Sequence, residues 1–253
     1  MGKVISVSNQ KGGVGKTTTA VNLAAFIAEK GKRVLIIDID PQANAGYGFG
    51  INAEKNDHTI YEVLIGTVSV REAIAPTGIE GLFIVPSNIN LTGAQVDLLE
   101  MNGKEYILKE AIRDIRDNYD YIFIDCPPSL GILTLNSLAA ADTVLIPLQC
   151  EYYALEGLSQ LLRIIALVQE NLNRSLTIEG VVLTMYDSRT NLSQQVVADV
   201  REYFSDRVFN TIIPRSVRLS EAPSFGKPIG LYDRASAGST AYENLADEVL
   251  KNE

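Results

Sequence analysis

A glycine-rich segment near the amino end of the chain carries the residue types that bind phosphate. It reads Lys11-Gly12-Gly13-Val14-Gly15-Lys16-Thr17-Thr18 and lies between a short apolar run and a stretch with helical spacing. Glycines let successive backbone N–H groups turn inward around phosphate oxygens, and the amino end of a helix adds a favourable field. Lys16 can lie along the β- and γ-phosphates, and the Thr17 hydroxyl can bind Mg²⁺. The segment therefore predicts a loop that holds ATP and Mg²⁺.

This loop departs from the standard phosphate-binding pattern at its start. The standard form, GxxxxGK[ST], has glycine at the position of Gln10, and here Lys11 follows that glutamine. The segment therefore matches the deviant form, xKGGxGK[ST], which carries a second lysine.

Carboxylates at the ends of strands are the other residues that phosphoryl transfer needs, because the reaction depends on neutralised charge and an oriented water. Asp125 ends the apolar run Tyr121–Ile124, at the edge where open parallel sheets bind ligands. It fits the role of holding Mg²⁺ directly or through water. Asp38 and Asp40 end a second apolar run. Asp38 has two open interpretations: it lies near the metal, or it accepts hydrogen bonds from neighbouring backbone amides.

Short β-branched runs alternate with helical patterns along the chain, which is typical of βα units around a mostly parallel sheet. Several runs are apolar throughout, as strands covered on both faces should be. We predict a single-domain α/β fold over residues 1–253, with a mostly parallel twisted sheet flanked by helices on both faces. The predicted strands are Val4–Ser8, Arg33–Asp38, Leu82–Pro86, Tyr121–Asp125, Thr143–Leu148, Ile178–Thr184 and Asn210–Ile213. The predicted helices are Lys16–Lys30, Lys104–Asn118, Leu155–Asn171, Leu192–Phe204 and Ala237–Leu250.

The composition indicates a packed, acidic protein. Of its 253 residues 46% are hydrophobic and 21% are charged, and the formal net charge is -9. This charge argues against a generally basic nucleic-acid binder, although an average can hide a local patch. With neither a signal peptide nor 18 consecutive apolar residues, we expect a cytoplasmic protein outside the membrane. Cys126 and Cys150 form no CxxC pair, so we expect both to be small buried hydrophobes.

Longer stretches of the sequence resemble a known family. The chain is similar to the ParA/MinD group of deviant Walker A P-loop ATPases, and most closely to ParA/Soj-type partition ATPases, over nearly its whole length. The matching pieces are KGGVGKTT at 11–18, IDIDPQANA at 37–45, IDCPPSLG at 124–131, LIPLQCEYYALEGL at 145–158 and IPRSVRLSEAPSFGKP at 213–228. The resemblance implies a P-loop NTPase fold and a Mg²⁺-dependent ATPase.

The resemblance also implies roles for single residues. Lys11 would reach across a homodimer to the ATP of the other subunit, so that two nucleotides are sandwiched between two protomers. Asp40 corresponds to the family's hydrolytic aspartate, and Asp125 corresponds to the Walker B carboxylate. Pro214 and Ser216 match the segment that lies against adenine; relatives often have Asn at the second position, and serine has less reach.

DNA is the implied cargo, because partition ATPases of this type bind double-stranded DNA non-specifically as ATP dimers. Arg189 and Arg218 match positions at which relatives contact DNA. Between positions 207 and 227 four basic residues stand against one acidic residue, Glu221. A patch that is doubled in a dimer would bind DNA in an ATP-dependent and salt-sensitive way. The resemblance further implies a ParB-like partner that stimulates hydrolysis, and association with the nucleoid.

Other members of the superfamily suggest alternative functions. A MinD-like positioning ATPase would act on a protein or membrane partner, but a membrane-binding carboxy-terminal helix should be basic, and residues 242–253 are acidic. An iron–sulfur carrier needs clustered cysteines, and a tyrosine kinase relative needs a tyrosine-rich tail. A binding module without turnover is disfavoured by Lys11, Lys16, Thr17, Asp40 and Asp125 together.

Overall fold

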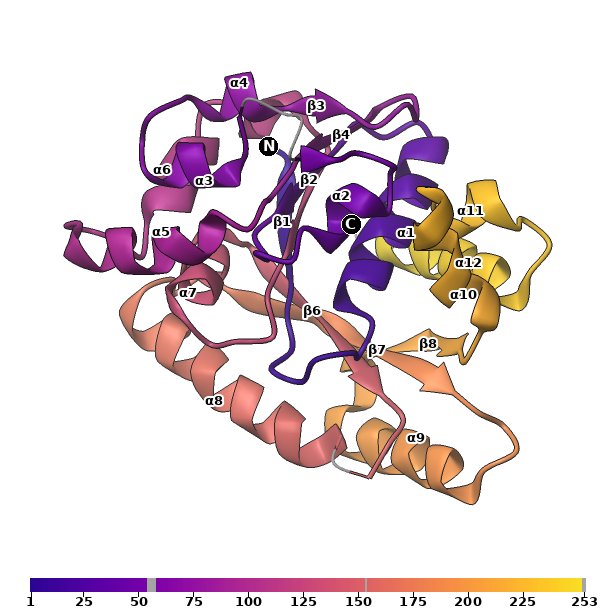
Figure 1. Ribbon diagram of the computed structural model, residues 1–253. Helices are drawn as coiled ribbons and strands as arrows, with labels where there is room; N and C mark the ends of the chain where they lie inside the picture. The colour runs from indigo at the N-terminus through magenta and orange to yellow at the C-terminus, as the bar shows by residue number, and fades with distance from the viewer. Residues whose placement is uncertain (54–57, 153, 252–253) are drawn as a thin grey trace.

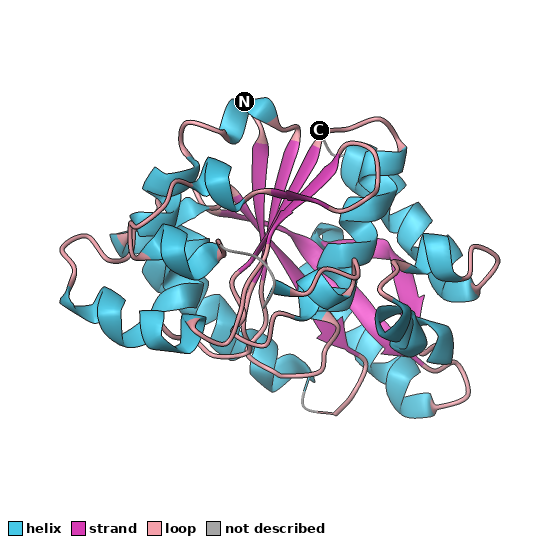
Figure 2. Cartoon of the chain, turned by 45° about the horizontal axis from the view of Figure 1, so that its top comes forward, coloured by secondary structure: helices cyan, strands magenta, loops and turns pink. Residues whose placement is uncertain are grey.

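The computed structural model describes residues 1–53, 58–152 and 154–251. Within these ranges the strands form one eight-stranded sheet in the order β3-β4-β2-β5-β1-β6-β7-β8. Every neighbouring pair is parallel except β3 with β4, at one edge. The sheet is twisted and carries helices on both faces (Figures 1 and 2). The predicted α/β class is therefore confirmed, whereas Tyr153, Asn252 and Glu253, in the predicted motif and tail, lie outside the described residues.

The elements have the following bounds. The strands are β1 Lys3–Val7, β2 Val34–Asp38, β3 Ala75–Pro76, β4 Leu82–Val85, β5 Tyr121–Asp125, β6 Thr143–Gln149, β7 Thr177–Tyr186 and β8 Val208–Pro214. The helices are α1 Lys16–Glu29, α2 Asn44–Tyr47, α3 Ile60–Leu64, α4 Val70–Ala73, α5 Leu91–Asp97, α6 Ile107–Ile112, α7 Ile132–Ala140, α8 Ala154–Asn171, α9 Asn191–Phe204, α10 Val217–Glu221, α11 Ile229–Tyr232 and α12 Ala237–Lys251. Short 3₁₀ turns are η2 Leu98–Glu100, η3 Arg116–Asn118, η4 Ser205–Arg207 and η5 Ala222–Phe225.

Two hydrophobic cores lie on opposite faces of the sheet, because successive side chains of a strand point to opposite faces. In β2, Leu35 and Ile37 join the core under α7, α8 and α9, while Val34 and Ile36 join the core under α1 and α12. All four side chains are fully buried. Coverage on both faces explains why the central strands read as apolar runs.

Helix α7 was not predicted, and its burial gives the reason. Eight of its nine residues are buried. A helix that is covered on nearly all sides has no polar stripe, so its sequence lacks the helical period that reveals a surface helix.

The predicted helix over residues 104–118 is shorter in the structure. Only α6 and the tight turn η3 are helical there. In η3, the Arg116 guanidinium bonds to the carbonyl of Gly2 and the carboxylate of Asp142. These contacts with distant parts of the chain are not visible in a local pattern.

The connections that leave the centre of the sheet around β1 run on opposite faces of the sheet. β1 lies between β5 and β6. The helix that follows β1 covers one face of the sheet, and the helix that follows β5 covers the other. Ligands of open α/β sheets bind where neighbouring connections part in this way, beyond the carboxyl ends of the strands.

Two loops at this edge of the molecule meet through glycines. Gly50 and Gly226 both have left-handed backbone conformations, with φ of 70° and 62°. A Cβ atom on Gly226 would lie 2.6 Å from the Cα of Gly50. The loop after α2 and the end of η5 therefore touch backbone to backbone.

No helix in the described ranges has the length and apolarity that crossing a bilayer requires. The apolar face of α12 is covered, since Tyr242, Leu245, Ala246 and Val249 are buried in the core shared with α1.

Candidate active site

The glycine-rich segment forms the connection between β1 and α1, as predicted. Two side chains hold it in place, one from just before the loop and one from a distant strand. The Asn9 side chain accepts from the backbone N–H of Lys11 at 3.0 Å and donates to the carbonyl of Pro147 at 2.7 Å. The Thr184 hydroxyl, on β7, donates to the carbonyl of Val14 at 2.8 Å. The loop is thus fixed to β6 and β7 as well as to its own strand.

The backbone of this loop has the shape of a phosphate cradle. Gly13 and Gly15 have φ of 73° and 89°, a conformation that favours glycine. Gly15 is the residue that precedes α1, and no side chain caps the amino end of this helix. The first N–H groups of a helix have no partner within it, so they remain available to an anion. These features fit the phosphates of a nucleotide.

Lys16, Thr17 and Asp125 converge beside the cradle. The Lys16 ammonium is buried and donates to the carbonyl of Lys11 at 3.3 Å. Burial lowers the pKa of Lys16, while the charges of Asp125 and Asp40 oppose that shift.

Asp125 ends β5 with both carboxylate oxygens fully buried and without a hydrogen-bond partner of normal geometry. Burial raises its pKa to about 7 and Asp40 adds to the rise, whereas the nearby Thr17 hydroxyl and Lys16 ammonium oppose it. A buried carboxylate without partners is unfavourable unless a cation compensates it. Together with the Thr17 hydroxyl it provides the hard oxygen ligands that Mg²⁺ prefers.

Asp38 ends β2, the strand next to β5, and Asp40 lies two residues beyond it. Asp38 pairs with Asp125 in the sheet register and accepts from the N–H groups of Asp40 and Ala45, each at 3.0 Å. Burial, followed by the charge of Asp125, raises the pKa of Asp38 well above its usual range. Asp40 accepts from the N–H of Gln42 at 2.9 Å. Asp38 therefore accepts from backbone amides in the turn that presents Asp40, which is one of the two interpretations open from the sequence.

A separate pocket of about 280 Å³ adjoins the cradle on the side of β8. Pro214 and Ser216 line it together with Gly15 and Thr18, so the structure places the predicted base segment next to the loop. Met185 also lines this pocket and has a positive φ of 53°. A non-glycine residue in this conformation is uncommon, and such strain is frequent at functional sites.

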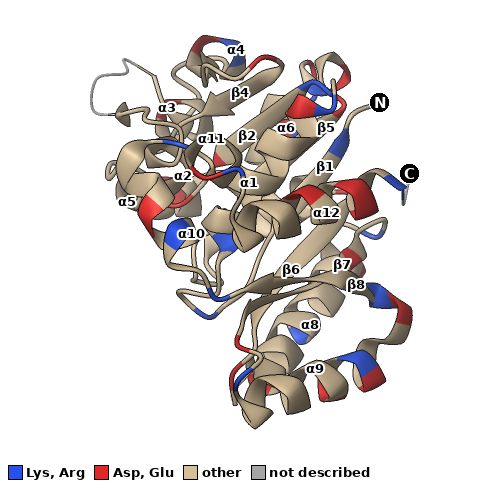
Figure 3. Cartoon of the chain, turned by 90° about the vertical axis from the view of Figure 1, so that its right-hand side faces the viewer, with Lys and Arg blue, Asp and Glu red and all other residues tan. Residues whose placement is uncertain are grey.

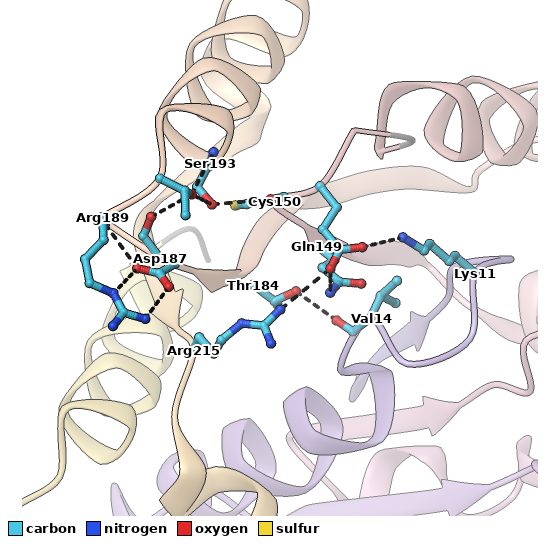
Figure 4. Close-up of polar contacts among 11 residues, drawn as sticks. Lys11, Val14, Gln149, Cys150, Thr184, Asp187, Arg189, Ser193 and Arg215 are labelled. Carbon is cyan, nitrogen blue, oxygen red and sulfur yellow. Dashed lines mark hydrogen bonds and ion pairs between the residues drawn. The ribbon is translucent and has the colours of Figure 1, made fainter.

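Lys11 lies outside its own cradle. Its ammonium forms an ion pair with Glu151 at 3.1 Å, and both side chains are partly exposed (Figure 4). The second lysine of the loop is therefore directed toward the end of β6, whereas Lys16 remains with the phosphate loop.

Arg189 and Arg218 lie on the surface, and each is paired with carboxylates of the same chain. Arg189 is 85% exposed and forms three hydrogen bonds with Asp187, one from its backbone N–H at 3.1 Å and two from its guanidinium at 2.8 and 2.6 Å. These bonds hold the pKa of Asp187 well below its usual range. Arg218 pairs with Glu221 at 3.0 Å and with Asp233 at 3.3 Å. Figure 3 shows Lys and Arg residues on and beside α10, and both basic and acidic residues on the elements around it.

Several residues of the site could not be found from the sequence. Thr184, Met185 and Glu151 lie at the ends of β7 and β6, far along the chain from the glycine-rich loop. Parallel pairing of β6 with β1 and of β7 with β6 brings them to it, and the matching stretch at 145–158 contains Glu151 without indicating a role for it. Cys126 and Cys150 are free and buried, as predicted, and burial raises the pKa of both thiols.

Comparisons with known sequences agree with this geometry. The AAA domain family matches residues 2–178. The chain is 56% identical over 252 residues to the sporulation initiation inhibitor protein Soj of Bacillus subtilis (strain 168), covering 100% of both chains. It is 55% identical over 253 residues to the chromosome partitioning protein ParA of Myxococcus xanthus (strain DK1622), covering 100% of this chain and 89% of that protein.

A solved structure shares the same fold with nucleotide bound. It is the cobyrinic acid a,c-diamide synthase of Mycobacterium smegmatis with an ATP analog and magnesium, with a TM-score of 0.88 and 40% sequence identity. The match covers 100% of this chain and 96% of that one.

Proposed function

The chain belongs to the ParA and Soj family of chromosome-partitioning ATPases, and from this membership we propose that its ATP-bound form is a sandwich dimer that binds double-stranded DNA without sequence preference. The protein is an ATPase that uses ATP and Mg²⁺. In the proposed cycle a ParB-like partner stimulates hydrolysis, the dimer separates and DNA is released. This cycle would operate in the cytoplasm, on nucleoid DNA, within the single P-loop ATPase domain of residues 1–253.

Residues of the loop and of neighbouring segments contact different parts of ATP. Backbone N–H groups from Gly12 to Thr18 surround the phosphates, and the Lys16 ammonium neutralises part of their charge. Thr17 and Asp125 hold Mg²⁺, which neutralises charge on the transferring phosphate when it is bound. Pro214 and Ser216 border the base pocket that adjoins the loop.

Asp40 and Lys11 are assigned to hydrolysis. Asp38 fixes the turn that carries Asp40, so the Asp40 carboxylate can orient the attacking water. The observation that supports the dimer most directly is the separation of the two lysines: Lys16 lies in the cradle, and Lys11 points out of it. An exposed ammonium at the entrance can approach the nucleotide of a second protomer and offset its charge, as an arginine finger does.

In the MinD-like alternative the partner would be a protein, because the structure disfavours a membrane partner. A helix that lies on a bilayer needs an exposed apolar face. The apolar face of α12 is buried against the sheet and α1. We therefore propose no membrane partner.

Binding to a random-sequence DNA duplex tests the proposal. We expect binding with ATP, weaker binding with ADP or without nucleotide, and loss of binding by Arg189→Glu and Arg218→Glu. Lys16→Ala should bind DNA no better with ATP than without nucleotide, because it cannot hold ATP productively.

Arg113→Glu is a matched control for this experiment. Arg113 is an exposed arginine that pairs with Glu110 three residues before it, much as Arg218 pairs with Glu221 three residues after it. It should bind DNA like the unmodified protein. If DNA binds in no nucleotide state while ATP is still hydrolysed, the cargo is not DNA.

A further inference from the structure

Glu151 occupies a defined position directly after β6. The preceding residue, Cys150, is buried, and its N–H bonds to the carbonyl of Thr184 on β7 at 3.1 Å. The Glu151 carbonyl accepts from the N–H of Ala154, at the start of α8, at 3.0 Å. The backbone of Glu151 is thus held between the sheet and the helix that follows it.

Three donors from different segments approach its carboxylate. Gln149 donates to Oε1 at 2.6 Å, and the Lys11 ammonium lies 3.1 Å from Oε2. The Arg215 guanidinium lies 3.6 Å from Oε1, which is an ion pair longer than a hydrogen bond. One carboxylate therefore joins the phosphate loop, the end of β6 and the base segment (Figure 4).

These contacts belong to a longer row of alternating charges. Arg215 also lies close enough to Asp187 to favour its charged form, and Asp187 in turn binds Arg189. The backbone N–H of Arg215 donates to the carbonyl of Tyr186 at 2.9 Å, which fixes the base segment to the end of β7. Lys11 is the last cation of this row, and Glu151 is its only carboxylate partner among the ion pairs of the described residues.

We propose that Glu151 is a positioning residue that holds the Lys11 ammonium against its own subunit until a second subunit is engaged, in competition with Arg215 for the same carboxylate. This role rests on the proposed dimer, in which Lys11 approaches the nucleotide of the other protomer. Lys11 cannot do so while it remains on Glu151, so dimer formation must break this ion pair once in each protomer.

The proposal sets the direction of two substitutions. Glu151→Gln keeps the size and a hydrogen-bonding end but removes the charge, so it should release Lys11 and make ATP-dependent dimerisation tighter. Arg215→Gln leaves Glu151 entirely to Lys11, so it should make dimerisation weaker at saturating ATP. A side chain that only supports the local fold would shift both variants toward weaker association.

The dimer dissociation constant is the quantity to measure, by sedimentation with ATP in an Asp40→Ala background that hydrolyses slowly. We expect Glu151→Gln to lower it by about two- to thirty-fold, because two partly exposed ion pairs break for each dimer formed. Glu156→Gln, an exposed position on α8, removes the same charge nearby and should leave the constant unchanged.

Added salt provides the second readout. Salt screens an exposed ion pair, so the ratio between Glu151→Gln and the parent should approach one as KCl rises. An equal or weaker dimer in Glu151→Gln at low salt would overturn the role of Glu151 while the proposed function stands. If the Asp40→Ala parent itself remains monomeric with ATP, both the dimer and this role are wrong.

Discussion

At the scale of single residues, Asp125 occupies an unfavourable position when no cation is bound. Its carboxylate is fully buried at the end of β5, and its oxygens have no hydrogen-bond partner of normal geometry. Burial and the nearby Asp40 raise its pKa to about 7. A group that binds its proton more tightly in the folded state than in the unfolded state loses stability as pH rises through that range. The metal site is therefore linked to the stability of the nucleotide-free protein.

Asp125→Asn tests this linkage because it removes the carboxyl group that titrates. From pH 4 to 7 the folded protein retains the Asp125 proton that the unfolded chain releases, so stability falls, and the full penalty is present above pH 7. The asparagine cannot ionise. Thermal melts in EDTA without nucleotide should show the variant more stable than the parent at pH 8 by several degrees, and much less so at pH 5. The same difference in melting temperature at both pH values would contradict the raised pKa.

At the scale of elements, strand β7 contacts the phosphate loop and holds it in place. The Thr184 hydroxyl is the contact, because it donates to the carbonyl of Val14. Both residues are buried, so neither group has water as an alternative partner.

Thr184→Val keeps the shape of the side chain and removes this donor. A buried carbonyl without a partner costs about 1–3 kcal/mol, so the loop should lose its fixed geometry and the Kd for ATP should rise about tenfold. Titration calorimetry measures this change. Thr177→Val, at the exposed opposite end of β7, is the control and should bind ATP normally. Equal affinities in both variants would show that β7 does not position the loop.

Elements with a local signal were predicted from the sequence, and elements defined by distant contacts were not. The central strands and α1, α8, α9 and α12 follow apolar runs or helical spacing, and their observed bounds differ from the predicted ones by a few residues at most. Helix α7 has no such signal because it is almost entirely covered. β3 is two residues long and contains Pro76, so neither its length nor its composition marks a strand.

The candidate site also contains some residues that local patterns predicted and others that only distant contacts bring together. The glycine-rich loop and the aspartates at strand ends are recognisable because their chemistry depends on short spacings within one segment. Met185 and Glu151 reach the site only through the order of the strands, which places β6 beside β1 and β7 beside β6. The base segment was recognised only through its resemblance to relatives, and the structure brings it next to the loop.

At the scale of the whole molecule, the net charge of -9 opposes nonspecific attraction to DNA. Arg189 and Arg218 are exposed, but each is paired with carboxylates of the same chain. A single protomer therefore offers DNA few uncompensated cations in this region. In the proposed dimer each arginine would be present twice, so DNA affinity would depend on association of the subunits.

The salt dependence of DNA binding should report this doubling. Each phosphate contact contributes about 0.9 to the slope of log affinity against log salt, so Arg189→Ala should lower the slope by about 1.8 when two copies are lost. Fluorescence anisotropy with ATP over a range of KCl concentrations measures the slope, and Arg113→Ala should leave it unchanged. A decrease near 0.9 would indicate that only one protomer contacts DNA through this residue.

The contact between Gly50 and Gly226 makes two distant segments mechanically dependent on each other. The first lies ten residues after Asp40, and the second lies eight residues after Arg218. No side chain separates the two backbones, so this contact contains no side chain whose rotation could absorb a displacement. A displacement of the loop after α2 toward η5 would therefore meet the backbone of the segment that carries Arg218 directly.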